Sequence, residues 1–101
     1  DVDWSRVTGF EWDAANVRKS LDKHSVTARE AEEPFLNGSV IVVRDPRHSV
    51  QEARYHALGV TDDGRSLHIT FTIRNQSTLV RVISARPMAR KERKAYAKTV
   101  E

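Results

Sequence analysis

The sequence predicts an α+β fold with two N-terminal helices, a four-stranded antiparallel sheet and a C-terminal helix. Helix-capping patterns precede residues 14 and 28, and four strand-like segments follow between residues 40 and 86. The turns between these segments are too short for βαβ crossovers, so neighbouring strands should pair antiparallel. With 101 residues, the chain is expected to form one domain over residues 1–101.

Two capping patterns define the N-terminal helices. The carboxylate of Asp13 can accept the free backbone N–H groups in the first turn of a helix over residues 14–24. Thr27 and Glu30 form a capping-box pattern, which predicts that a second helix starts near residue 28. Further along the chain, residues 88–98 form a basic segment with a weak apolar edge, which predicts the closing helix.

Strand character is found in four segments, namely residues 40–44, 54–60, 66–74 and 79–86. The third alternates most clearly, with apolar Leu67, Ile69, Phe71 and Ile73 on one face and polar His68, Thr70, Thr72 and Arg74 on the other. The fourth has apolar residues on both faces, which places it in the middle of the sheet. We expect the helices to cover the apolar face and the polar face to stay open to a ligand.

Charge is distributed unevenly along the chain. Residues 1–53 carry 7 Lys and Arg against 10 Asp and Glu, a net −3, whereas residues 54–101 carry 10 against 4, a net +6. The basic half either binds a polyanion or forms ordinary solvated surface. There is no cysteine, which excludes a disulfide framework and a thiol nucleophile and fits a cytoplasmic protein. The longest aliphatic run, Val40 to Val43, is far too short to cross a membrane.

Familiar catalytic motifs are absent, since the chain has no Gly-rich phosphate loop, His-x-x-x-His pair or Gly-x-Ser-x-Gly elbow. What remains is a set of arginines, four histidines and a few carboxylates around a small sheet. Such a set can support RNA cleavage without a metal ion or cofactor, because the ribose 2′-OH of the substrate is itself the nucleophile. Arginine would stabilise charge on the phosphate, and a histidine or carboxylate would move the proton.

The arginines on the predicted strands are the candidates for phosphate binding. Arg86, Arg74 and Arg54 each could bind a phosphate or form a structural salt bridge. Arg81 and Arg86 are an odd number of positions apart, so one site can use both only if the strand contains a bulge. Glu52 lies two residues before Arg54 and could be its ion-pair partner.

The histidines are less clearly placed. His24 ends the first helix, where it either takes part in chemistry or caps the last carbonyls. His48 lies in a loop, and His56 and His68 are strand residues without a special context. The basic closing helix could bind RNA backbone, dock an acidic segment of a partner protein, or be plain solvated surface.

The order of motifs resembles that of the BrnT toxin family, from Phe10 to about Tyr96. The resemblance is carried by Phe10-Glu11-Trp12-Asp13, Lys23-His24-Ser25-Val26, Phe35-Leu36, Asp45-Pro46-Arg47-His48, Glu52-Ala53-Arg54, Ala57-Leu58-Gly59, Asp63-Gly64-Arg65, Phe71-Thr72-Ile73-Arg74, Arg81-Val82-Ile83-Ser84-Ala85-Arg86 and Arg90-Lys91-Glu92-Arg93-Lys94-Ala95-Tyr96. Each motif is weak by itself, but ten in the same order over most of a short chain form a specific signal.

The resemblance implies a RelE-like fold and a ribonuclease toxin that cleaves RNA and arrests growth. It also implies a BrnA-type antitoxin with a ribbon–helix–helix domain, which forms a heterotetramer with the toxin and provides the only contact with DNA. The matching segments imply a catalytic set of His24, Glu52, Arg54, Arg74, Ser84 and Arg86. RNA-binding residues would be Arg81, Arg90, Lys91 and Lys94. No metal or cofactor is implied.

Two positions depart from the family pattern. The family usually has glycine after the Lys-His pair, where this chain has Ser25, and Pro34 falls where the family usually continues its second helix. Two other hypotheses about the function of the chain remain. It could be a nucleic-acid-binding module that does not cleave, or a protein whose only role is to hold a partner.

Overall fold

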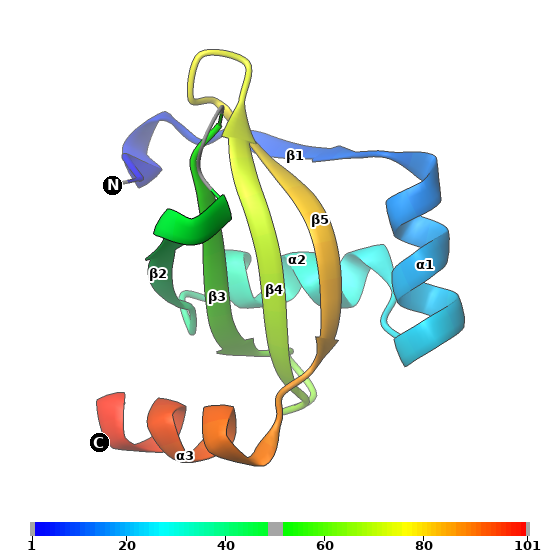
Figure 1. Cartoon of the computed structure of the whole chain (residues 1–101), viewed down its shortest axis with the longest axis vertical. Coiled ribbons are helices and arrows are strands. Elements are labelled where there is room, and N and C mark those ends of the chain that lie inside the picture. Colours follow the sequence, from blue (N-terminus) through cyan, green and yellow to red (C-terminus); the bar gives the residue numbers. More distant parts are fainter. Residues whose placement is uncertain (1, 49–51, 101) are drawn as a thin grey trace.

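The computed structural model describes residues 2–48 and 52–100, which form a five-stranded mixed sheet with three α-helices (Figure 1). The strands are β1 (Gly9–Trp12), β2 (Ile41–Asp45), β3 (Arg54–Val60), β4 (Ser66–Arg74) and β5 (Leu79–Pro87). The helices are α1 (Ala14–His24), α2 (Ala28–Leu36) and α3 (Arg90–Thr99), with short 3-10 helices η1 (Trp4–Arg6) and η2 (Pro46–His48).

The predicted α+β class and the antiparallel meander of β2 to β5 are confirmed, but the prediction of a four-stranded, purely antiparallel sheet is wrong. The strand order is β1-β5-β4-β3-β2, and β1 pairs parallel to β5 in the register Gly9 with Leu79 to Trp12 with Val82. A strand of four residues is too short to show an alternating pattern. The pairing of β1 with β5 also places β5 inside the sheet, as predicted.

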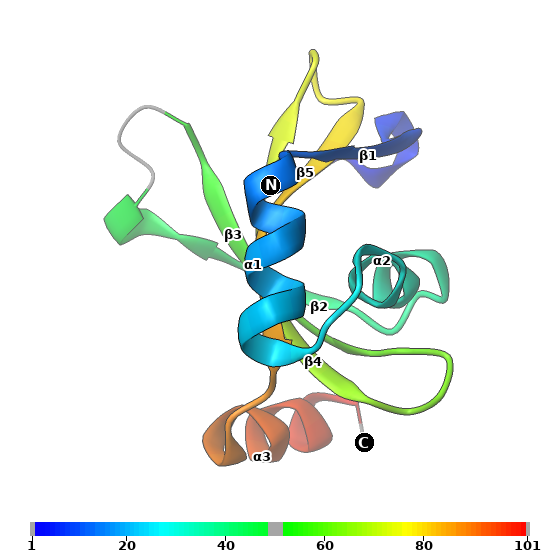
Figure 2. The same ribbon diagram turned by 90° about the vertical axis from the view of Figure 1, so that its right-hand side faces the viewer.

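Helix α2 lies against the apolar side of the sheet, and α1 lies along the edge formed by β5 (Figures 1 and 2). Figure 2 shows α2 on one side of the sheet and η2 on the other. Gly59 lets α2 approach β3, because a Cβ at that position would lie 2.8 Å from Cβ of Pro34. Helix α1 runs beside β5, where Oγ of Ser20 accepts a hydrogen bond of 3.1 Å from the backbone N–H of Ala85. This bond satisfies a strand-edge donor that would otherwise be unpaired.

The core lies between the sheet and these two helices. The buried apolar residues of the sheet alternate along the strands as predicted, and they are joined by Val26 and Ala31 from the helical segment. Thr70 and Thr72 on the opposite face of β4 are buried as well, so the expectation that the polar face is open to a ligand is wrong for the middle of that strand. Phe71 is at the centre of an aromatic cluster, with ring centroids 5.1 Å from Phe35 and 5.4 Å from Tyr55. Burial of this apolar surface is the main stabilising contribution to the fold.

Helix α3 is in a different position from the one expected. The sequence predicts that the helices cover the apolar face, but α3 lies across one end of the sheet, and Tyr96 donates a hydrogen bond of 2.6 Å to the carbonyl of Ser39 (Figure 1). None of its residues is buried. A helix with so weak an apolar edge has little to gain from packing on the core, and polar contacts determine its position.

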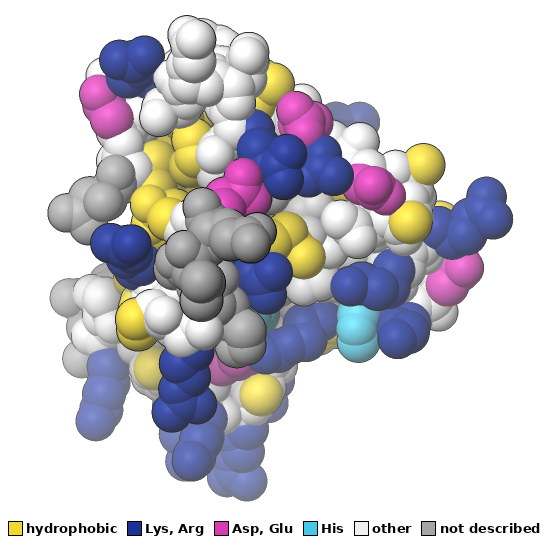
Figure 3. Space-filling model, turned by 45° about the horizontal axis from the view of Figure 1, so that its top comes forward, with side chains coloured by type: hydrophobic (Ala, Val, Ile, Leu, Met, Phe, Trp, Pro, Cys, Tyr) yellow, Lys and Arg dark blue, Asp and Glu magenta, His cyan; other side chains and the backbone are white. Residues whose placement is uncertain are grey.

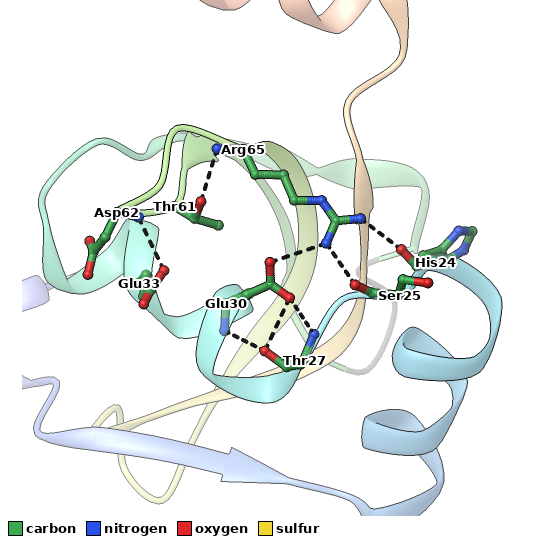
Figure 4. A network of polar contacts seen from close by, with 8 residues as sticks. All are labelled: His24, Ser25, Thr27, Glu30, Glu33, Thr61, Asp62 and Arg65. Carbon is green, nitrogen blue, oxygen red and sulfur yellow. Dashed lines mark hydrogen bonds and ion pairs between the residues drawn. The ribbon is translucent and has the colours of Figure 1, made fainter.

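The corner between α1 and α2 is built around Arg65 of the β3–β4 turn (Figure 4). Its guanidinium donates to the carbonyls of Ser25 at 2.7 Å and His24 at 2.9 Å, and to Glu30 at 3.2 Å. The predicted capping box is confirmed, because Thr27 and Glu30 each accept a bond from the backbone N–H of the other. The corner therefore joins two helices to the hairpin through one arginine.

Ser25 adopts the left-handed conformation at this corner, with φ 54° and ψ 36°. We expect Ser25→Gly to raise the free energy of unfolding by about 0.5–1 kcal/mol, because glycine removes the steric cost of positive φ for a side chain. Urea titration of both proteins measures this difference. Ser25→Ala is the matched control, since it keeps Cβ and should bring no gain. Equal effects of the two substitutions would contradict the strain argument.

Candidate active site

The sheet face opposite α2 carries polar side chains, and a β-bulge determines which of them share it. Thr70 of β4 pairs with Ser84 of β5, but the next residue, Phe71, pairs with Val82. Ile83 is therefore an extra residue in β5, which resets the alternation of side chains between the two faces. Val82 stays in the core, and Ser84 faces the polar side.

This bulge brings Arg81 and Arg86 onto one face, which a regular strand could not do. Arg81 pairs in register with Thr72, and Arg86 pairs with His68. Side chains of residues directly opposite in an antiparallel pair lie on the same face. The structure therefore contains the bulge that a site with both Arg81 and Arg86 requires.

Two histidines lie beside these residues. The ring centroids of His56 on β3 and His68 on β4 are 4.9 Å apart. Both ring nitrogens of His56 have partners, since Nε2 is 2.8 Å from Oδ2 of Asp45 and Nδ1 is 3.1 Å from Oγ1 of Thr70. His56 is therefore held in a fixed orientation between β2 and β4.

A carboxylate from α3 completes a polar cluster that consists of His56, His68, Arg86 and Glu92. Glu92 binds Arg86 through two hydrogen bonds of 2.8 Å, one to each terminal nitrogen, and also accepts the backbone N–H of Ala89. The bond from Arg86 lowers the pKa of Glu92 to about 2, so this carboxylate is ionised at neutral pH. Burial, and then the charge of Arg86, lower the pKa of His68 below its usual value. His68 is consequently neutral at pH 7.

The polar face contains several of the predicted catalytic residues. Arg54 pairs in register with Thr72, and Ser84 with Thr70, so both belong to the same face as Arg86. Figure 3 shows Lys and Arg side chains across the molecule, with Asp and Glu side chains between them, and further Lys and Arg side chains projecting from its lower end. A phosphate backbone could follow these cations.

Two predicted residues form a separate pair at the end of β4. Nε of Arg74 is 2.6 Å from Oε2 of Glu52, and both side chains are 43% exposed. The sequence left open that Glu52 pairs with Arg54, and the ion pair found is with Arg74, because β4 carries Arg74 to the segment that precedes β3. Position along the chain suggested the nearer arginine, whereas the strand register determined the partner.

His24 is not brought into the polar cluster. It ends α1, and its backbone carbonyl accepts a bond from Arg65, while no hydrogen bond to its imidazole is found among residues 2–48 and 52–100. Arg81 is held by Glu11 and by Asp13, the latter at 3.5 Å, which links β5 to β1 and α1. The other predicted RNA-binding residues, Arg90, Lys91 and Lys94, are exposed on α3.

Sequence reasoning missed His56, His68 and Glu92. His68 occupies the same alternating face as Thr70, so its position was available from periodicity. Its proximity to His56 and Glu92 was not, because these residues come from different strands and from a helix. Among the described residues, no group of three or more His, Asp and Glu has the geometry of a metal site.

Comparison with known proteins identifies the family of this chain. A family model described as "Ribonuclease toxin, BrnT, of type II toxin-antitoxin system" matches residues 12–92. This chain belongs to the BrnT family. The resemblance found in the motifs is thereby confirmed, and the match extends from Trp12 in β1 to Glu92 in α3.

The fold agrees with a solved structure of the same family. The chain is similar to the ribonuclease toxin BrnT of Brucella abortus, with a TM-score of 0.65 and 22% identity over 83% of this chain and 100% of that one. At this identity the likeness concerns the fold alone. No curated protein matches the chain significantly. No helix in the described part of the BrnT chain is long and apolar enough to cross a membrane.

Proposed function

We propose that this chain is an endoribonuclease that works without a metal ion, at the polar face of the sheet. The ribose 2′-OH would attack the adjacent phosphate, so the protein needs only to hold the phosphate, stabilise its charge and move protons. The observation that supports this site is the convergence of Arg54, Ser84 and Arg86 on one face, which Arg81 joins because of the bulge at Ile83.

Within this proposal, Arg86 binds the phosphate through its planar fork, which stays charged at all relevant pH values. Arg54 and the exposed cations of α3 hold the RNA backbone on either side of the cleaved bond. Because membership of the family implies an antitoxin, we also propose a BrnA-type ribbon–helix–helix antitoxin as the partner, in a heterotetramer that contacts DNA through the antitoxin alone.

The test is incubation of the purified chain with bacterial RNA in excess EDTA. We expect fragments with 2′,3′-cyclic phosphate and 5′-hydroxyl ends. A substrate with 2′-deoxyribose at the cleaved position should stay intact, because it lacks the nucleophile. Cleavage that stops in EDTA, or equal cleavage of the 2′-deoxy substrate, would show that the mechanism is wrong. If free RNA stays intact, ribosome-bound RNA is the second substrate to test.

One observation favours a non-catalytic role as the alternative. Arg74, Arg81 and Arg86 are all paired with carboxylates, so a phosphate must displace a carboxylate to bind any of these guanidinium groups. In a module that only binds an antitoxin, these pairs would be purely structural. Such a module would bind its partner with neither RNA cleavage nor an effect on growth.

A further inference from the structure

The ion pair between α3 and β5 has the geometry of an arginine bound to a phosphate. Oε1 and Oε2 of Glu92 each lie 2.8 Å from one terminal nitrogen of Arg86. This two-bond arrangement is the one in which arginine binds either a carboxylate or two oxygens of a phosphate. Oε2 of Glu92 also lies 3.9 Å from Nε2 of His68. A phosphate in place of this carboxylate would bind Arg86 and lie beside Nε2 of His68.

We propose that the Glu92 carboxylate occupies the position of the scissile phosphate, and that His68 accepts the proton of the 2′-OH at that position. This inference rests on the proposed ribonuclease function and assigns its proton acceptor. The substrate phosphate displaces Glu92 from Arg86, and the departure of Glu92 uncovers His68. Glu92 is thus an internal competitor of RNA.

The reaction at this site balances without an additional reagent. The 2′-oxygen forms a bond to phosphorus as its proton passes to Nε2 of His68, and the bond between phosphorus and the 5′-oxygen breaks. The leaving 5′-oxygen takes a proton from water, and His68 later returns its own proton to solvent. The products are a 2′,3′-cyclic phosphate and a 5′-hydroxyl.

The surroundings of His68 suit it for this role better than those of its neighbour. Arg86 faces it from β5, Glu92 from α3 and His56 from β3, with Asp45 of β2 behind His56. Burial and Arg86 keep His68 neutral at pH 7, and only a neutral imidazole can accept a proton. Both nitrogens of His56 are already hydrogen-bonded, to Asp45 and Thr70, so neither is open to take the proton of the 2′-OH.

Displacement of Glu92 requires little rearrangement of the fold. Helix α3 has no buried residue. Besides Glu92, its contacts include the hydrogen bond from Tyr96 to Ser39 and one of 2.8 Å from Arg93 to the carbonyl of Met88. A rotation of the Glu92 side chain, or a small shift of the first turn of α3, would free the fork of Arg86.

Glu92→Gln tests the competition. Glutamine keeps the capping bond to the backbone N–H of Ala89 but has no charge to hold Arg86. We expect binding of a non-cleavable 2′-deoxy oligonucleotide to become roughly three- to tenfold tighter, and cleavage of RNA to rise. Asp22→Asn is the matched control, because Asp22 is exposed on α1 and its loss removes the same charge elsewhere. Equal tightening in both variants, or loss of cleavage in Glu92→Gln, overturns the proposal.

His68→Asn tests the proton acceptor. We expect cleavage to fall by roughly 10²–10⁴-fold, while affinity for the 2′-deoxy oligonucleotide stays within about twofold of wild type. In the wild type, kcat/KM should rise with pH as His68 loses its proton and reach half of its plateau value below pH 6.5, since the pKa of His68 is lowered from 6.5. His68→Asn should lack this rise of kcat/KM with pH. An unchanged pH profile overturns the assignment, even if activity falls through loss of structure.

The two proposals fail in distinguishable ways. If the wild type cleaves neither free nor ribosome-bound RNA, the ribonuclease function is wrong, and the binding measurements still decide whether Glu92 competes with a phosphate. If the wild type cleaves RNA and His68→Asn cleaves equally well, the function stands and the assignment of His68 is wrong.

Discussion

Arg86→Ala is expected to lower kcat/KM for RNA cleavage by roughly 10²–10³-fold, the usual cost of one preorganised donor to a developing negative charge. Arg86 pairs in register with His68, and both side chains approach Glu92, so the loss of Arg86 removes charge stabilisation at the proposed position of the reacting phosphate. Binding of RNA should weaken less than cleavage, because the exposed cations of α3 still contact the backbone. Rates and binding constants measured on the same oligonucleotide separate these two effects.

The control for this prediction is Arg18→Ala, which removes one exposed cation of α1 that takes no part in the proposed site. We expect it to cleave at the wild-type rate. Arg86 and Glu92 are partly exposed, so loss of their ion pair should cost no more than about 1 kcal/mol of stability. A thermal melt close to that of the wild type would show that Arg86→Ala is folded. A folded Arg86→Ala that cleaves as fast as Arg18→Ala would remove Arg86 from the site.

Phe71→Ala is expected to lower the free energy of unfolding by about 3–5 kcal/mol, the range for a buried aromatic side chain. Phe71 is fully buried and contacts the rings of Trp4, Phe35 and Tyr55, with centroids between 5.1 and 6.1 Å away. Small domains have total stabilities of roughly 5–15 kcal/mol, so this one change could leave the domain marginal. Chemical denaturation, followed by circular dichroism, measures the loss.

Leu36→Ala is the matched control for the core substitution, because Leu36 is 73% exposed at the end of α2. Its loss should change stability by less than about 0.5 kcal/mol. If Leu36→Ala and Phe71→Ala have similar effects, the aromatic cluster is not the stabilising centre of this fold.

Local chemistry accounts for the parts of the fold that could be predicted. Helix α1 begins and ends where Asp13 and Ser25 place its caps, and the capping box of Thr27 and Glu30 starts α2. Strands β3 and β4 have the predicted bounds, because alternation over seven and nine residues is a strong periodic signal. Pairing of β2 to β5 follows from the short turns between them.

The candidate site was only partly predictable. The motifs pointed to Arg54, Ser84 and Arg86, which the structure places on one face, but also to His24, which lies at the end of α1. His68 and Glu92 carried no local signal, since a strand histidine and a helix glutamate are ordinary residues until their neighbours are known.

By itself, the sequence determined the helices, the four longer strands and the family, because these depend on residues close together in the chain or on the order of motifs along it. The tertiary structure decided the parallel pairing of β1, the bulge at Ile83 and the approach of Glu92 to Arg86 and His68. Each of these joins segments distant in sequence, and their contacts depend on strand register and on how the helices pack. No local pattern of residues encodes that packing.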